Sequence, residues 1–286
     1  MCKVICWFSG GVTSAVAGKK ASEIYGINNC RFIMIDTFNE DEDTYRFKND
    51  CEKWYGKKIE TISAIPEKYN NIVEVWEKYL SLNVAHGAIC SSELKREIRK
   101  RWQKENEYDY QVFGFEFTKK EFNRALSLSI NYPESKPIFP LLLFGLDKKK
   151  CIEILQNAEI EIPRTYKLGF HNNNCFQTGC VQGGIGYWQK MKEEFPNKFL
   201  YMADIEHDLT NRKGKPVTML KDQSKAAKIS GKINVFLKKH PDYPELKSLN
   251  DMPKCEVKPL FECNGFCGIN DLNDQNKTEL EINYAE

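Results

Sequence analysis

A short glycine-rich segment near the N-terminus has the residue types of a phosphate-binding loop. Ser9-Gly10-Gly11-Val12-Thr13-Ser14 follows an apolar run and precedes an amphipathic stretch. Glycines let the backbone curl around an anion, while backbone N–H groups, hydroxyls and a helix N-terminus supply donors and positive potential. The segment lacks the lysine of a Walker loop and the third glycine of a dinucleotide fingerprint. Taken alone, it predicts either a phosphate site or an ordinary strand-to-helix turn.

Four of the eleven cysteines form two close pairs in loop-like sequence, Cys175 with Cys180 and Cys263 with Cys267. Four converging thiolates satisfy zinc, and the same ligands can hold an iron–sulfur cluster, so spacing does not choose between them. Two other hypotheses stay open. The four can be separate thiols in a reducing compartment, or Cys263 can be a redox nucleophile with Cys267 as its resolving thiol.

Five other cysteines lie in apolar or helical stretches and are expected to be small buried side chains: Cys2, Cys6, Cys30, Cys51 and Cys151. Cys90 differs, because it stands just before an expected helix N-terminus and near five cations, conditions that lower a thiol pKa. We hypothesise that Cys90 accepts or transfers sulfur, or ligates a cluster. The alternative is that it packs beneath the glycine-rich loop.

The five cations occupy about two turns of the helix expected at 91–104 and are flanked by Trp102: Lys95, Arg96, Arg99, Lys100 and Arg101. Positions 95, 99 and 102 share one helix face. Such a face either follows a nucleic-acid backbone or is a solvated surface whose charge Glu93 and Glu97 partly neutralise. The solvated surface is the more frequent case.

Short apolar runs alternate with longer amphipathic stretches in the first half, which is typical of parallel strands joined by crossover helices. Strands are expected at 3–8, 31–36, 58–63 and 110–115. Helices are expected at 14–25, 42–55, 67–80, 91–104 and 147–156. This order predicts an α/β fold with a doubly wound, mostly parallel sheet of Rossmann-like type, in which ligands bind at the carboxyl ends of the strands.

The composition of the sequence changes after about residue 163, where loops rich in Asn, Gly and Cys begin. Helices are expected at 186–194 and 221–239. We expect residues 1–163 to form a nucleotide-binding α/β domain. Residues 164–286 are expected to form a Cys-rich C-terminal region, either a small lobe or an extension of the first domain. Residues 270–286 are polar, and we expect them to be loosely held.

Composition excludes several classes of protein. The 286 residues carry 42 Lys plus Arg against 40 Asp plus Glu, which argues against a polycationic nucleic-acid wrapper and an acidic tail. A hydrophobic content of 41% excludes a disordered chain. No apolar run reaches the roughly eighteen residues of a membrane span, and the run 4–8 is too short for a secretory signal. We therefore expect a cytoplasmic protein that does not enter a membrane.

Four segments in order resemble one family. Ser9–Ser14 resembles the SGGxxS loop of the PP-loop ATP pyrophosphatases, also called adenine nucleotide alpha hydrolase-like proteins. The other three are similar to its phosphoadenosine phosphosulfate (PAPS) reductase branch. They are Asp36-Thr37-Phe38-Asn39-Glu40, similar to DTGxE with Phe38 in place of glycine; Cys90-Ser91-Ser92-Glu93-Leu94-Lys95, similar to a cysteine-to-LK segment; and Gly114 followed by Glu121-x-x-Arg124-Ala.

Two later segments resemble reductase-like proteins that phages and mobile elements often carry. Residues 166–188, YKLGFHNNNCFQTGCVQGGIGYW, resemble an NNNC…GCVxGGxGYW block, and residues 261–267, FECNGFC, resemble a terminal EC…FC. The resemblance therefore covers residues 1 to about 268. It departs at Asn264, because sulfonucleotide reductases have glycine after the attacking cysteine.

The resemblance implies that Ser9, Gly10, Gly11, Thr13 and Ser14 hold the phosphates of ATP or of an adenylyl sulfate. It places Asp36 and Glu40 where acidic groups meet a ribose hydroxyl or Mg²⁺, with a solvated acidic loop as the alternative. Lys95 and Arg124 are then candidate phosphate clamps that stabilise charge on leaving pyrophosphate.

The leading functional hypothesis is an enzyme that cleaves ATP between the α and β phosphates, adenylates an acceptor oxygen and releases pyrophosphate. Sulfur or nitrogen then displaces AMP. A nucleobase or nucleic acid is an acceptor by family association only. The alternatives are a thiol-dependent sulfonucleotide reductase in which Cys263 or Cys90 attacks sulfur, and a non-catalytic nucleotide-binding module.

Overall fold

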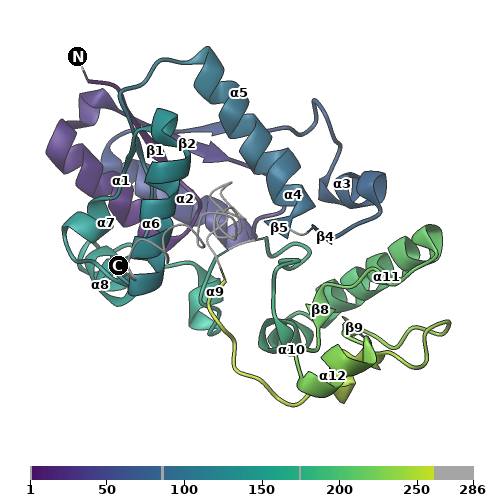
Figure 1. Cartoon of the computed structure of the whole chain (residues 1–286). Coiled ribbons are helices and arrows are strands. Elements are labelled where there is room, and N and C mark those ends of the chain that lie inside the picture. Colours follow the sequence, from purple (N-terminus) through teal and green to yellow (C-terminus); the bar gives the residue numbers. More distant parts are fainter. Residues whose placement is uncertain (1, 85–86, 174, 261–286) are drawn as a thin grey trace, which may run out of the picture.

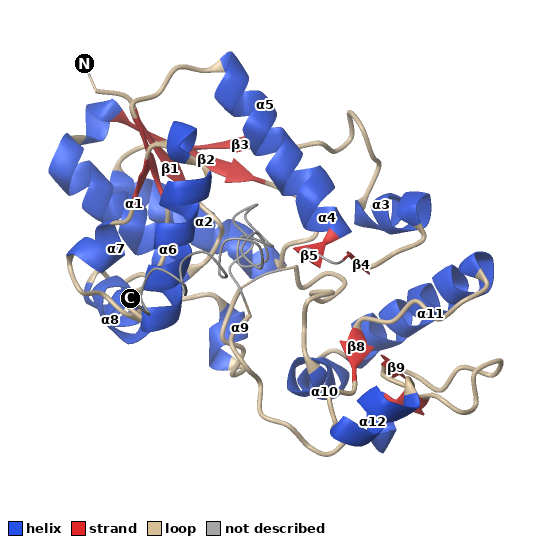
Figure 2. Cartoon of the chain, in the orientation of Figure 1, coloured by secondary structure: helices blue, strands red, loops and turns tan. Residues whose placement is uncertain are grey.

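A five-stranded parallel sheet forms the centre of the molecule (Figure 2). The computed structural model describes residues 2–84, 87–173 and 175–260. The sheet order is β3-β2-β1-β6-β7, and each neighbouring pair is parallel. Its strands are β1 (Val4–Trp7), β2 (Cys30–Ile35), β3 (Ile59–Ile62), β6 (Tyr110–Val112) and β7 (Pro137–Ile138). The strand order reverses between β1 and β6, so the carboxyl ends of these strands border the crevice in which doubly wound folds bind ligands.

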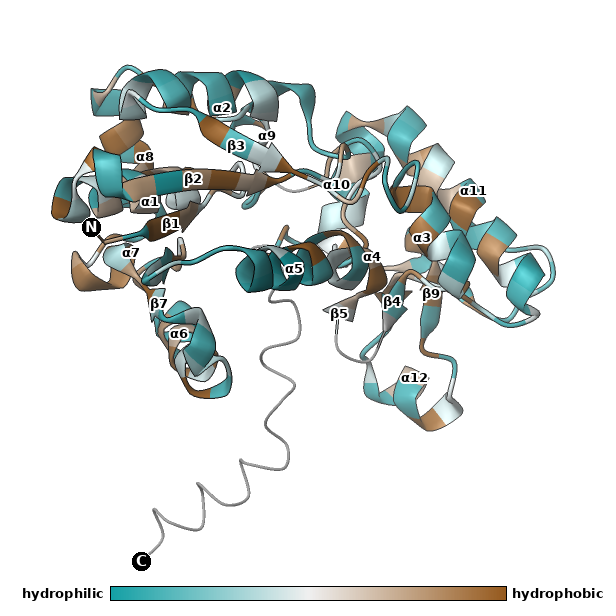
Figure 3. Ribbon diagram, turned by 90° about the horizontal axis from the view of Figure 1, so that it is seen from above, coloured by the Kyte–Doolittle hydropathy of each residue, from teal (hydrophilic) through white to brown (hydrophobic). Residues whose placement is uncertain are grey.

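Helices cover both faces of this sheet, which explains why β1 is apolar throughout. Cys6 of β1 faces a cluster formed with α1 (Val12–Tyr25), α2 (Glu42–Tyr55) and α8 (Lys148–Asn157). Trp7 faces the opposite cluster, with α5 (Glu97–Glu105) and α6 (Lys119–Asn131). Figure 3 shows α2 and α5 on opposite sides of the strands. The predicted fold class is confirmed.

Helix boundaries follow capping chemistry more closely than apolar spacing. The helix expected at 67–80 begins only at Ile72, because the Asn71 side chain accepts hydrogen bonds from the N–H groups of Val73 and Glu74 and caps α3 (Ile72–Tyr79). The helix expected at 91–104 is divided into α4 (Ile89–Ser91), a π-helical turn (Ser92–Arg96) and α5. Helices α6 and α11 (Pro196–Lys213) were not expected.

The second half contains a three-stranded sheet of its own, with order β10-β9-β8. The prediction of a long helix at 221–239 is wrong. The chain instead forms β8 (Leu220–Lys221), α12 (Lys225–Ser230) and β9 (Asn234–Phe236), and then β10 (Lys247–Ser248). Gly231, with a φ of +70°, ends α12, and the β-branched and aromatic side chains Val235 and Phe236 are fully buried in the sheet that follows.

A third apolar cluster joins this sheet to α10 (Ile185–Glu194), α11 and α3, with Trp76 and Trp188 fully buried at its centre. Several short elements complete the chain: β4 (Asn83–Val84), β5 (Gly87–Ala88), α7 (Pro140–Leu143), α9 (Arg164–Lys167), and 3-10 turns at Ile27–Asn29, Pro133–Ser135 and Leu249–Asp251. The boundary at 163/164 stays a prediction. Throughout the described ranges, each helix is too short or too polar to cross a membrane.

Candidate functional site

The glycine-rich loop leaves β1 and enters α1 at the switch point of the sheet (Figure 1). Gly10 has a φ of +81°, and a Cβ atom there would lie 2.6 Å from Cγ2 of Thr44. The Gly10 carbonyl oxygen accepts a hydrogen bond of 2.9 Å from Nδ2 of Asn173, which also donates to the Thr44 hydroxyl at 2.9 Å. Segments far away in the sequence therefore fix the shape of the loop, and only glycine fits at position 10.

The loop also holds itself through one hydroxyl. Oγ of Ser14 accepts a hydrogen bond from the N–H of Ser9 at 3.1 Å and donates to the carbonyl of Gly11 at 2.9 Å. Gly114, just after β6, packs so closely that a Cβ atom there would lie 2.7 Å from the backbone N of Ser14. The end of β6 thus presses directly on the start of α1, which explains the glycine at position 114.

The N-terminus of α1 keeps its positive potential. Its N-cap is Gly11, which has no side chain to accept hydrogen bonds, and its first turn holds no acidic residue. By contrast, Asp41 caps α2, Thr118 caps α6 and Asp147 caps α8. The N–H of Val12 donates to the neutral hydroxyl of Tyr166 at 3.4 Å, which leaves the dipole of α1 without an acidic group in its first turn. A helix end of this kind behind a glycine-rich turn favours an anion.

The segment after β2 folds into a tight acidic turn. Asp36 is 3% exposed, and its Oδ1 accepts hydrogen bonds from the N–H of Phe38 at 2.8 Å and from the hydroxyl of Tyr45 at 3.0 Å. Burial, and then the Asp36 carboxylate, raise the pKa of Tyr45, so its hydroxyl stays a donor. Phe38 has a φ of +51°, a left-handed conformation that suits the glycine of the resembled DTGxE segment.

Glu40 and Lys95 form a buried ion pair. Nζ of Lys95 lies 3.3 Å from Oε1 of Glu40, and the two residues are 6% and 1% exposed, respectively. Thr37 also donates to this carboxylate, at 3.4 Å. The solvated acidic loop is therefore wrong as a description of Glu40. The pair brings the acidic turn and the π-helical turn of residues 92–96 together.

The helix face of residues 95, 99 and 102 is buried, so a solvated surface is wrong for this face. The solvated description fits the exposed Lys100, which pairs with Glu97 at 3.5 Å. Arg99 is 3% and Trp102 is 7% exposed, and the Trp102 ring meets Trp7 of β1 edge-on at 5.5 Å. This face packs toward the sheet because Trp102 is large and apolar. Lys100 and Arg101 point elsewhere and are exposed.

Arg124 lies on α6, and neighbouring side chains determine its position. Its Nη1 donates to both carboxylate oxygens of Glu121, at 2.8 and 2.7 Å, and its guanidinium carbon lies 4.6 Å from the centre of the Phe115 ring. Phe115 follows Gly114, which contacts the phosphate loop. The role of Arg124 as a clamp stays a prediction.

The loop that carries Cys175 and Cys180 is tied to the acidic turn. The N–H of Gln177 donates to the Asn39 carbonyl at 3.1 Å, and the Asn39 side chain donates to the Thr178 hydroxyl at 2.7 Å. Both cysteines are buried, at 8% and 9% exposure. Cys263 and Cys267 lie outside the described residues. Within residues 2–84, 87–173 and 175–260, no group of three or more His, Cys, Asp or Glu side chains is arranged to hold a metal ion.

Cys90 is 8% exposed and packs in the apolar cluster that also contains Leu94 and Cys180. A different cluster lies under α1, so the alternative that Cys90 packs beneath the phosphate loop is wrong. Cys6, Cys30, Cys51 and Cys151 are buried as expected, whereas Cys2 is partly exposed.

Sequence reasoning missed Asn173, Thr44 and Tyr45, which hold the loop and the acidic turn from outside. Asn173 stands inside the NNNC block, but three consecutive asparagines do not reveal which one faces the loop. Thr44 and Tyr45 lie in the first turn of α2, just after its N-cap Asp41. The capping residue in the sequence was the signal that could have placed both side chains at the start of this helix.

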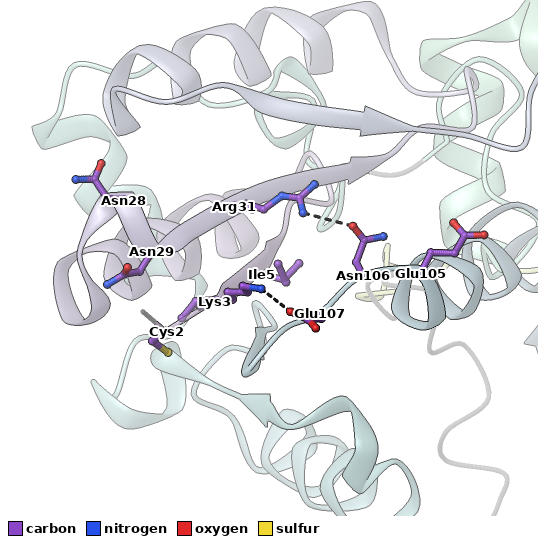
Figure 4. A pocket seen from close by; sticks show the side chains of 10 residues that line it. Cys2, Lys3, Ile5, Asn28, Asn29, Arg31, Glu105, Asn106 and Glu107 are labelled. Carbon is purple, nitrogen blue, oxygen red and sulfur yellow. Dashed lines mark hydrogen bonds and ion pairs between the residues drawn. The ribbon is translucent and has the colours of Figure 1, made fainter.

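A cavity of about 410 Å³ lies at the amino ends of the strands, opposite the glycine-rich loop. The starts of β1 and β2 and the segment before β6 line it (Figure 4). Lys3 pairs with Glu107 at 2.7 Å, and Arg31 donates to Asn106 at 3.5 Å. The strands are parallel, so this cavity is at their amino ends and the phosphate loop is at their carboxyl ends. It is not the nucleotide site of a doubly wound fold.

The chain resembles known proteins in three-dimensional structure and not in sequence. No family model and no curated protein matches the chain. The chain is similar to a PAPS reductase from Candida auris, solved as a phosphate complex, with 16% identity, 61% of this chain and 82% of that chain covered, and a TM-score of 0.44.

The chain is also similar to the U34-tRNA thiolase NcsA from Methanococcus maripaludis, solved with its [4Fe-4S] cluster. The identity is 16%, the coverage is 73% of this chain and 72% of that chain, and the TM-score is 0.38. At this identity, both likenesses concern the fold alone.

Proposed function

We propose that this chain binds ATP with its polyphosphate in the Ser9–Ser14 loop and cleaves it between the α and β phosphates. The observation that carries the proposal is the loop itself, which Asn173, Thr44 and Gly114 contact in front of the N-terminus of α1, a helix with glycine at its N-cap and no acidic residue in its first turn. Bound phosphate would replace the Ser14 hydroxyl as the partner of the Ser9 N–H. The motifs assign the chain to the PP-loop family.

In the proposed reaction an acceptor oxygen attacks the α phosphorus, the bond to the β phosphate breaks, and pyrophosphate leaves. Sulfur or nitrogen then displaces AMP from the adenylated acceptor. Lys95, oriented by Glu40, and Arg124, oriented by Glu121, stabilise the charge on pyrophosphate. Asp36 is the candidate carboxylate for Mg²⁺ or a ribose hydroxyl, since Mg²⁺ is usually bound by one or two carboxylates together with phosphates. Catalysis rests on positioning and charge.

We further propose that Cys175, Cys180, Cys263 and Cys267 hold Zn²⁺ or an iron–sulfur cluster. The first two thiols are buried, as metal ligands are, and the N–H of Leu260 donates to Oδ1 of Asn172 at 2.8 Å. Cys263 follows three residues later, and an extended residue spans about 3.3–3.6 Å, so the chain from Leu260 is long enough to reach the Cys175 loop. The metal would join the C-terminal segment to this loop.

A sulfonucleotide reductase is the second candidate. Asn172 binds Leu260 while its neighbour Asn173 binds Gly10, so the chain that leads to Cys263 starts close to residues that hold the phosphate loop. In that reaction the Cys263 thiolate would attack the sulfur of an adenylyl sulfate, and the bond from sulfur to the phosphate oxygen would break and release the nucleotide. A second thiol, Cys267 or an external thiol, would then displace sulfite from the Cys263 S-sulfonate and form a disulfide.

Product analysis tests these candidates. With ATP, Mg²⁺ and a panel of acceptors, the first predicts AMP and pyrophosphate in equal amounts. Sulfite release from an adenylyl sulfate, without AMP formation from ATP, would favour the reductase. Nucleotide binding without turnover in both assays would support the non-catalytic module. Elemental analysis with an absorption spectrum tests the metal, and Cys175→Ser should lose it.

A further inference from the structure

The positive charge of this chain is concentrated in one segment. Residues 212–239 hold nine of the 42 Lys plus Arg and one of the 40 Asp plus Glu, a net charge of +8. The rest of the chain therefore has 33 cations against 39 acids, a net charge of −6. Whole-chain composition hides this asymmetry because the two parts nearly cancel. A segment of one sign on an otherwise acidic protein indicates a partner of opposite charge.

Seven lysines of this segment are exposed. One of them, Lys239, donates to the carbonyl oxygen of Leu246 at 2.6 Å. We name the other six the lysine surface: Lys215, Lys221, Lys225, Lys228, Lys232 and Lys238. The single acid of the segment, Asp222, is buried and pairs with Lys247 at 2.8 Å. Across the described ranges, no carboxylate lies within ion-pair distance of any of the six. Within the part of the chain that the structure describes, ion pairs therefore do not offset their mutual repulsion.

Four residues of the lysine surface belong to one structural unit, β8–α12–β9, while Lys215 precedes it and Lys238 follows it. Lys225 and Lys228 lie one turn apart on α12, and Lys221 of β8 stands opposite Asn234 of β9. Lys232 follows the turn at Gly231. Figures 1 and 3 both show α12 at the periphery of the molecule, away from α1. The unit therefore presents its charge outward.

We propose that the lysine surface docks the phosphate backbone of a nucleic acid. The sole aromatic side chain in residues 215–239, Phe236, is fully buried, so the surface offers charge for phosphates and no ring on which unpaired bases could stack. This favours a double-stranded partner.

A membrane fits the same surface less well. Interfacial helices are longer and carry an apolar stripe, whereas α12 has six residues and its exposed large apolar side chain is Ile229. The inference deepens the proposed function, because it names a polynucleotide as the acceptor class. It also moves the nucleic-acid contact from the helix of residues 95–102 to the second sheet.

Fluorescence anisotropy with short labelled duplexes of DNA and of RNA, at increasing salt, tests the inference. Wild type should bind, with a log–log salt slope that reports several phosphate contacts. The variant Lys225→Gln/Lys228→Gln/Lys232→Gln should bind at least about fivefold more weakly at low salt, with a slope smaller by about 2–3. The duplex that binds more tightly identifies the acceptor as DNA or RNA.

The matched control removes three exposed charges from α5, as Lys100→Gln/Arg101→Gln/Lys104→Gln. It should retain affinity within about twofold, because the same net charge is lost outside the docking surface. Circular dichroism establishes that both variants are folded. An equal loss in the control, or no salt-dependent binding by wild type, would overturn the inference. So would tighter binding to vesicles of phosphatidylcholine and phosphatidylserine than to either duplex.

ATP calorimetry on wild type separates this inference from the proposed function. Heat with ATP but no binding to either duplex would overturn the docking surface alone. Duplex binding without heat from ATP would overturn the enzyme and leave the docking surface standing.

Discussion

The side-chain amide of Asn173 donates a hydrogen bond to the carbonyl oxygen of Gly10, and this contact joins positions 163 residues apart. It makes the shape of the phosphate loop depend on the loop that carries Cys175. The Thr165 hydroxyl donates to Oδ1 of Asn173 at 2.9 Å and fixes the amide orientation. In the proposed function Asn173 is a positioning residue, because it contacts the backbone of Gly10 and its contribution to ATP binding passes through that contact.

The variant Asn173→Leu is expected to weaken ATP binding at least about tenfold, because three buried partners lose their hydrogen bonds and each unsatisfied group costs about 1–3 kcal/mol. Asn172→Leu is the control, since Asn172 is equally buried but binds Leu260 instead. Calorimetry on both variants measures the difference. Equal ATP affinity for the two would show that Asn173 does not shape the loop.

The variant Gly10→Ala is expected to abolish measurable ATP binding and to lower the free energy of unfolding by about 1–3 kcal/mol, because it adds a side chain at positive φ. The new Cβ also meets Cγ2 of Thr44. Thr44→Ser removes that methyl group and keeps the hydroxyl that Asn173 contacts, so the double variant should recover part of the stability.

Gly214→Ala is the control for backbone strain. Gly214 has a φ of +68° at the end of α11, and a Cβ there meets no atom within 4 Å. Its ATP affinity should equal that of wild type. If Thr44→Ser restores nothing to Gly10→Ala, strain alone explains the loss, and the contact with Thr44 is unimportant.

Replacing Lys95 by Met should destabilise the fold by up to about 3–5 kcal/mol, because the buried Glu40 carboxylate loses its ammonium partner. The double variant Lys95→Met/Glu40→Gln should recover most of this loss in chemical denaturation but form no AMP and pyrophosphate. Lys100→Met, which disrupts an exposed pair with Glu97, should change stability by less than about 1 kcal/mol. A fully active double variant would remove Lys95 from the reaction.

Stability should fall as pH rises from about 5 to 8 because of Glu206 on α11. Burial raises its pKa from 4.5 to about 8, although the N–H groups of Met219 and Leu237 donate to the carboxylate. The folded chain then holds a proton that the unfolded chain releases, so the stabilisation is complete below pH 4.5 and is lost through the folded pKa.

The size of the Glu206 effect is at most on the order of 5 kcal/mol. Thermal melting of wild type and Glu206→Gln across this pH range measures it, and the difference between the two curves cancels the contribution of the groups that both proteins share. Parallel curves would exclude a proton on Glu206.

The sequence was sufficient for four strands of the parallel sheet, because central strands such as β1 are buried on both faces and apolar. It missed β7, which has only two residues, and helix α6. The sequence was also sufficient to select Gly10 and Ser14 as loop residues, because the positive φ of Gly10 and the hydrogen bond from Ser14 to Gly11 are local features. It was insufficient for Asn173 and Thr44, whose role depends on tertiary contacts with the loop. It also failed at residues 221–239, where frequent lysines imitate a helix although Gly231 interrupts it and Val235 and Phe236 form a strand.

The most direct measurement is a calorimetric titration of the wild-type chain, with Mg²⁺, against ATP, ADP, AMP, adenosine and an adenylyl sulfate. If the loop holds phosphate groups, affinity should fall from ATP to AMP, and adenosine should bind at least about a hundredfold more weakly than ATP, because charge-assisted hydrogen bonds are lost with each phosphate. No heat from any adenine nucleotide, or adenosine binding as tightly as ATP, would contradict the account.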